Sequence, residues 1–155
     1  MGLDMYLKAS KYVGGWEVSG TKETFKNILK AANIPEELAD DNAPSLTVEV
    51  NVGYWRKVNA IHNWFVKECG DGRDECQDIY VTPSKLTELR DLCSSLLKDR
   101  NEERAMKELS PQSGFFFGGT NVDSWYWEGL EDTVKIINKV LKNFLEYDIY
   151  YRASW

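Results

Sequence analysis

The sequence has little cysteine and less histidine, with three cysteines and one histidine among 155 residues. The odd number of cysteines (Cys69, Cys76 and Cys93) argues against a disulfide framework, and we expect all three to be reduced. A chain of this length can bury a core without disulfide or metal staples. We therefore expect a single domain, residues 1–155, held together by packing.

Long hydrophobic runs are missing too, and none approaches the length of a membrane-spanning helix. Residues 1–8 carry an acid within their apolar part and show no cleavable signal pattern. Tyr6 occupies the position where the myristoylation pattern requires serine or threonine. These features predict a cytoplasmic protein that does not bind membranes.

Two common catalytic motifs do not occur. There is no GxxxxGK[ST] phosphate-binding loop and no GxSxG nucleophile elbow. A triad that needs histidine would have to use His62. Positive charge is also in deficit: 19 Lys and Arg against 25 Asp and Glu give a net charge of -6. Phosphates repel such a surface, so we expect no direct binding to nucleic acid and favour a partner with a basic surface.

Alternating apolar residues predict several short strands. Leu3, Met5 and Leu7 point one way along residues 3–9, and residues 46–52 alternate in the same manner up to Gly53. Further strands are expected at residues 79–81, at the glycine-bounded run 114–119 and at the aromatic C-terminus, residues 148–155. A strand at each end of the chain favours pairing of the two ends.

Helical spacing predicts four or five helices between these strands. One follows Thr21, a central helix spans residues 54 to about 68, and a third starts at Thr82 and Pro83. A weaker helix follows within residues 98–108, and the last begins after Thr120 or Asp123. With about four to six strands in a mixed or antiparallel sheet, the predicted fold class is α+β.

The richest polar and aromatic chemistry lies in residues 54–65. The candidate binding residues there are Tyr54, Trp55, Arg56, Lys57, Asn59 and His62. On the predicted helix, Trp55, Asn59 and His62 share one face, where a histidine beside an amide and a cation could bind an anion or act as a general base. The alternative is a half-buried helix whose His and Asn side chains satisfy backbone groups of a neighbouring strand.

A metal site is the next possibility to weigh. His62, Cys69 and Cys76 supply the right atoms for zinc, but their spacing matches no known zinc motif and a fourth ligand is unassigned. Asp71, Asp74 and Glu75 resemble a calcium loop in composition alone. We therefore expect no cofactor, with zinc at His62, Cys69 and Cys76 as the alternative.

Aromatic and acidic side chains indicate a binding surface. Neighbouring rings at residues 125–127 and 150–155 cannot all point inward, so some are expected to be exposed. Acids in two polar loops are the remaining candidate binding residues: Asp40, Asp41, Asp71 and Asp74. Exposed aromatic rings near acids are typical of protein-binding surfaces.

Four segments together carry a resemblance that spans nearly the whole chain. They are MGLDMYL at the start, YWRK followed by Asn59, His62, Trp64 and Phe65, then GFFFG, and YYRASW at the end. In these the chain resembles a family of small proteins encoded by bacteriophages and prophages. The resemblance implies a setting in the host-cell cytoplasm, where small acidic phage proteins often inhibit host or defence proteins, as anti-CRISPR proteins do.

We therefore expect a protein that binds and inhibits a host or defence protein through an acidic and aromatic surface. The alternative is a small enzyme acting on a nucleotide or phosphate compound, with Arg56, Lys57 and His62 in its site. An enzyme predicts a concave pocket where these three side chains converge. An inhibitor predicts a broad acidic or aromatic surface, and a structural phage protein predicts self-association.

Overall fold

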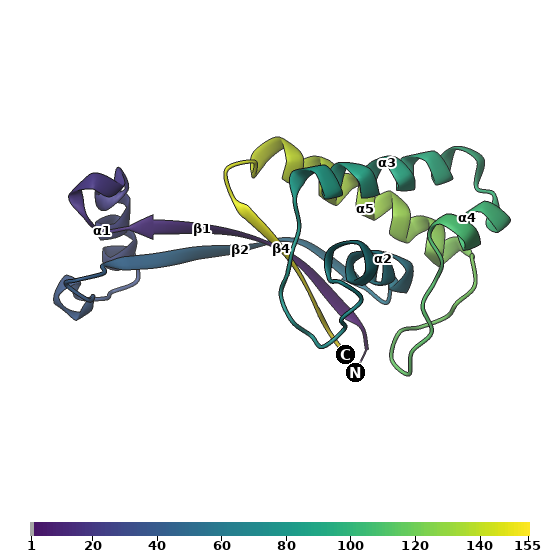
Figure 1. Cartoon of the computed structure of the whole chain (residues 1–155), viewed down its shortest axis with the longest axis horizontal. Coiled ribbons are helices and arrows are strands. Elements are labelled where there is room, and N and C mark those ends of the chain that lie inside the picture. The colour runs from purple at the N-terminus through teal and green to yellow at the C-terminus, as the bar shows by residue number, and fades with distance from the viewer. Residues whose placement is uncertain (1) are drawn as a thin grey trace. The chain divides into compact units, whose positions relative to one another are not determined.

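The computed structural model describes residues 2–155, which form five α-helices, two short 3-10 helices and four strands (Figure 1). In chain order they are β1 (Asp4–Gly14), η1 (Glu17–Ser19), α1 (Lys22–Ala31), η2 (Glu36–Leu38), β2 (Ser45–Arg56), α2 (Asn59–Cys69), β3 (Ile79–Tyr80), α3 (Pro83–Asp99), α4 (Glu102–Glu108), α5 (Ser124–Asn143) and β4 (Asp148–Ser154). The strands form one antiparallel sheet in the order β2-β1-β4-β3. The predicted α+β class is confirmed, and β1 and β4 pair the two ends of the chain as expected.

The residues fall into two compact units. The larger unit comprises the chain up to Ala9 together with Asn51–Trp155, and the smaller unit is Ser10–Val50. Both draw on β1 and β2, whose residues are divided between them. None of the helices among the described residues has the length and apolar character needed to cross a membrane.

The larger unit packs helices against the sheet. β1 alternates as predicted, and Leu3, Met5 and Leu7 are fully buried. β3 and β4 pair antiparallel, with Ile79 opposite Tyr151. Helix α3 packs along α5 (Figure 1). Within this core the ring of Phe65 stacks on the ring of Tyr151, with centroids 4.2 Å apart.

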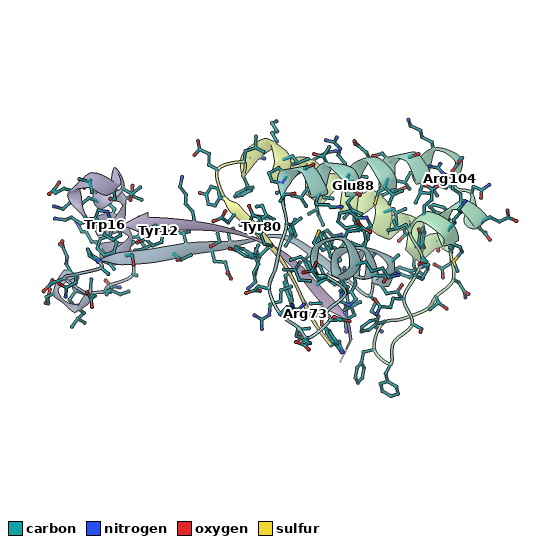
Figure 2. The ribbon with its side chains drawn as sticks, viewed as in Figure 1. Tyr12, Trp16, Arg73, Tyr80, Glu88 and Arg104 are labelled. Carbon is teal, nitrogen blue, oxygen red and sulfur yellow. The ribbon has the colours of Figure 1, made fainter. Side chains whose placement is uncertain are left out.

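The smaller unit has its own core beneath α1. Val13, Phe25 and Leu29 are buried, and Leu46 and Val48 of β2 pack against them. Thr21 precedes α1 as predicted, but its hydroxyl bonds the backbone of Gly14 instead of capping the helix. The rings of Tyr12 and Trp16 lie 6.2 Å apart and are both exposed (Figure 2).

The central helix begins later than the sequence predicted. Strand β2 continues through Gly53 to Arg56, and α2 starts at Asn59. Gly53 lies within the strand because β2 passes close to α5 at this position. A Cβ at residue 53 would lie 2.5 Å from Cγ2 of Ile136 on α5. Lys57, in the left-handed conformation at φ 58°, turns the chain from strand to helix.

The predicted strand at residues 114–119 is also wrong, because this segment is a turn within the loop between α4 and α5. Three consecutive phenylalanines read as a buried strand, yet they occupy three different environments. Phe117 is buried, Phe116 is half-buried and Phe115 is 94% exposed.

Candidate functional site

A cleft of about 730 Å³ lies in the larger unit, between the junction of β2 with α2 and the start of α5. It is lined by Tyr54, Trp55, Arg56, Lys57, Val58, Asn59, Ala60, Pro111, Gly118, Gly119, Asn121, Asp123, Trp125, Tyr126, Glu128, Gly129 and Asp132. Five of the predicted binding residues, from Tyr54 to Asn59, therefore line one concave site. The sequence singled out the residues of one wall of this cleft, although it placed the helix boundary wrongly.

One wall of the cleft carries the cations. Arg56 and Lys57 are both exposed at the end of β2. Arg56 Nε lies 3.8 Å from Asp4 Oδ1, and the Tyr54 hydroxyl donates to that same oxygen at 2.5 Å. This hydrogen bond to the carboxylate is the largest cause that raises the pKa of Tyr54. The contacts orient Tyr54 and Arg56 along the rim of the cleft.

The opposite wall is the first part of α5 and is acidic. Asp123 caps the helix by accepting from Tyr126 N–H at 3.1 Å, and Glu128 and Asp132 follow along the helix. Trp125, at the second position of the helix, is 77% exposed, whereas Tyr126 and Trp127 beside it are buried. The prediction that some rings of this cluster are exposed is confirmed, and the exposed one lines the cleft.

Buried polar groups hold the cleft in shape. Trp55 Nε1 donates to Thr133 Oγ1 at 2.9 Å, which ties β2 to α5. Asn59 Nδ2 donates to the carbonyls of Phe117 and Gly119, and its Oδ1 accepts from Gln112 N–H. The Asn59 side chain therefore positions the adjacent loop and has little capacity left for a ligand.

His62 lies away from the cleft, fully buried in the core of the larger unit. Its Nε2 is 3.0 Å from Asp74 Oδ2, and its Nδ1 is 2.7 Å from the Tyr151 hydroxyl. A carboxylate only accepts hydrogen bonds, so Nε2–H donates to Asp74; Nδ1 of the neutral ring then accepts from Tyr151. Burial, and secondarily the charge of Asp74, raises the pKa of Tyr151 well above its ordinary value.

The structure thus separates residues that the sequence grouped. A shared helical face for Trp55, Asn59 and His62 is wrong, because Trp55 belongs to β2 and points into the core. Arg56 and Lys57 meet in the cleft, but His62 is not among its lining residues. The alternative, in which His and Asn satisfy backbone groups of a neighbouring strand, is right for Asn59 only in part, because the backbone groups belong to a loop. His62 binds the side chains of Asp74 and Tyr151 instead.

The four acidic candidates lie in two loops outside the cleft. Asp40 Oδ1 accepts from the backbone of Asn42 and Ala43, and Asp41 beside it is exposed. Asp71 lines a smaller hollow of about 250 Å³ together with Arg73 and Tyr80. Asp74 is bound to His62. Only Asp41 and Asp71 remain as simple exposed charges.

The cysteines and His62 do not form a ready metal site. Among residues 2–155 no group of three His, Cys, Asp or Glu side chains is placed to hold a metal ion. Burial raises the pKa of Cys69 to about 11 and that of Cys93 to about 12, so both thiols stay protonated near neutral pH. Zinc at His62, Cys69 and Cys76 would require His62 to release one of its two partners.

Comparisons with protein-family models, with curated proteins and with solved structures found no match. What the chain does must therefore be inferred from its own side chains. Two observations bear on it most directly. Trp125 is exposed in a cleft with a cationic and an acidic wall, and His62 is committed elsewhere.

Proposed function

We propose that this chain acts by binding another protein, and that the cleft receives a segment of the partner. The observation that carries the proposal is Trp125, which is 77% exposed in a concave site of about 730 Å³. Tyr54 and Arg56 line the same cleft. Trp, Tyr and Arg are the residue types that most often contribute the binding energy of protein interfaces.

The charge of the molecule favours a partner with a basic surface. The net charge is -6, and α5 presents Glu128 and Asp132 to the cleft. Opposite charges accelerate encounter and disfavour wrong partners more than they add affinity. Arg56 and Lys57 on the other wall would then fix the orientation of the bound segment by pairing with a carboxylate or a carbonyl group.

The resemblance to phage and prophage proteins supports a host or defence protein as this partner. In that setting, binding would inhibit the partner in the manner of anti-CRISPR proteins. An acidic chain is suited to covering the basic channel of a nucleic-acid-binding effector.

A small anionic ligand is the second candidate, because the cleft is concave and Arg56 and Lys57 both line it. Turnover of a nucleotide or phosphate compound would also need a group that moves protons. His62 does not fill that role, since both of its ring nitrogens have partners inside the core. Protein binding does not require a free histidine, so it fits the geometry better than turnover of a phosphate compound does.

The test is affinity capture from a host-cell lysate with the wild-type chain, followed by mass spectrometry. Trp125→Ala should lose the enriched partner. Tyr80→Ala should keep it, because Tyr80 is an exposed aromatic residue outside the cleft. Equal capture by wild type and Trp125→Ala would contradict the cleft as the binding site. Specific retention of a phosphate compound in place of a protein would favour the second candidate.

A further inference from the structure

The loop between α4 and α5 presents an aromatic ring to water. Phe115 is 94% exposed, and its ring lies perpendicular to that of Phe116, with centroids 4.8 Å apart. Phe117 N–H donates to Gly114 O at 3.1 Å. This bond closes a four-residue turn with Phe115 and Phe116 at its two central positions. Figure 1 shows the loop in green, joining α4 to α5.

The turn is fixed on both sides by hydrogen bonds from other elements. Leu3 N–H, before β1, donates to Phe116 O at 3.1 Å. Asn59 Nδ2 donates to Phe117 O at 3.0 Å and to Gly119 O at 2.8 Å. Upstream, Asn63 Nδ2 donates to Ser110 O at 3.1 Å. Buried amides of α2 therefore hold the backbone that carries Phe115.

Phe117 anchors the same turn in the core. It is buried, and its ring packs edge-on against His62 and Trp155, with centroids 5.1 and 5.8 Å away. The chain thus buries one phenylalanine to secure the segment that displays another. Phe115 itself adds little to the stability of the fold, because an exposed ring removes almost no apolar surface from water.

We propose that Phe115 is an anchor that inserts into an apolar pocket of the protein partner. A buried aromatic anchor surrounded by weaker contacts is the usual centre of binding energy in an interface. The fixed backbone lowers the entropy lost on binding, since the turn is already ordered. Gly118 and Gly119 of this loop line the cleft, so the anchor and the cleft can engage the same partner. The inference rests on the proposed function in taking the occupant to be a protein.

The net charge of the chain disfavours two other occupants of such a ring. A net charge of -6 is repelled by the anionic lipids of a cytoplasmic membrane face. Two copies of this chain would bring together two molecules of that same charge. A protein with an apolar pocket inside a basic surface satisfies both the ring and the charge.

The experiment places a benzophenone amino acid at position 115 and irradiates host cells that contain the full chain. Leu145, another exposed apolar residue of the larger unit, is the matched position. We expect a protein adduct from position 115 that maps to apolar residues of a folded partner domain, and none from position 145. With that partner purified, Phe115→Ala should raise the Kd at least about tenfold and Leu145→Ala less than about twofold.

Three results would overturn the inference. These are an adduct with the mass of two copies of the chain, flotation of the protein with anionic or neutral vesicles that depends on Phe115, and an unchanged Kd for Phe115→Ala. The outcome is separable from that of the cleft. If Phe115→Ala weakens binding and Trp125→Ala does not, the anchor stands and the cleft is wrong. The reverse pattern keeps the cleft and removes the anchor.

Discussion

Both ring nitrogens of His62 have hydrogen-bonding partners inside the fold. Asp74, Tyr151 and the rings of Phe117 and Trp155 surround it. Replacing it would leave the buried Tyr151 hydroxyl without a partner, and an unpaired buried group is costly. The part-exposed Asp74 carboxylate would lose its partner as well. Loss of activity in a His62→Ala variant is therefore evidence of catalysis only if its stability has been measured as well.

Tyr151, one of the partners of His62, predicts that the stability of the fold depends on pH. Burial raises the pKa of Tyr151 above its ordinary value, so the folded state holds this proton more tightly than the unfolded chain does. The stabilisation is complete below the unfolded pKa, about 10, and declines as the pH rises beyond it. Urea unfolding measured from pH 7 to pH 11 (about 4 units) gives the free energy of unfolding at each pH. This free energy should decline with rising pH for wild type and decline less steeply for Tyr151→Phe.

Wild type and Tyr151→Phe are compared in the same buffers, so the difference between their slopes reports the contribution of Tyr151. Equal slopes for wild type and Tyr151→Phe would show that ionisation of Tyr151 does not govern alkaline unfolding.

Among the elements, the junction of β2 and α2 shapes the cleft. Strand β2 passes so close to α5 that only a glycine fits at position 53, where a Cβ would meet Ile136 Cγ2 at 2.5 Å and Leu7 Cβ at 3.2 Å. Leu7 Cβ is fixed to its backbone, and Ile136 Cγ2 moves away only if this β-branched side chain leaves its preferred helical rotamer. The cationic wall and the acidic wall are therefore set at a fixed separation by the packing of one strand on one helix.

Gly53→Ala should consequently lower the free energy of unfolding by about 1–3 kcal/mol, the usual cost of overpacking a core. Gly119→Ala is the matched control, because nothing lies within 4 Å of a Cβ at that position. Chemical denaturation of the two variants makes the comparison. A loss no larger for Gly53→Ala than for Gly119→Ala would mean that the strand and helix can move apart.

The sequence predicted those helices and strands whose positions depend on residues near one another in the chain. Alternation identified β1, and β-favouring aromatic residues identified β4. The Thr82–Pro83 pair marked the start of α3, where Thr82 Oγ1 accepts from Lys85 N–H. The end of β2 and the loop after α4 depend on contacts distant in sequence. Nothing near Gly53 signals the approach of Ile136, and nothing near Phe115 signals that Asn59 holds its loop. The sequence located one wall of the cleft, and packing supplied the other.

For the molecule as a whole, the acidic charge is shared by both units. The smaller unit has four Lys and Arg against seven Asp and Glu, a net charge of -3, which leaves -3 for the larger unit. Fields of this kind act over roughly a Debye length, about 8 Å at physiological salt. Acids outside the cleft therefore contribute to the encounter with a basic partner without contacting it.

Removing such charges should slow association and leave the fold intact. Asp41→Lys and Asp71→Asn both change exposed carboxylates, and Asn tolerates the left-handed backbone of Asp71, at φ 53°. Stopped-flow association with the purified partner should give lower on-rates at low salt and rates near wild type at high salt. Denaturation midpoints should barely move, because exposed charges contribute little to stability.

Asp74→Ala is the contrasting variant, since the Asp74 side chain accepts from His62 and loss of this acceptor should lower the denaturation midpoint. Salt-independent on-rates for the wild-type chain would remove electrostatic steering from the proposed function.

The path of the chain has a genetic consequence. The smaller unit is one uninterrupted stretch, entered along β1 and left along β2, and those strands are hydrogen-bonded neighbours. Its buried residues and those of the larger core form separate sets. A single deletion therefore removes residues 10–50. A short turn of about two to five residues can join the remaining parts of β1 and β2. Recombination can exchange or discard this segment while the gene keeps every residue that lines the cleft.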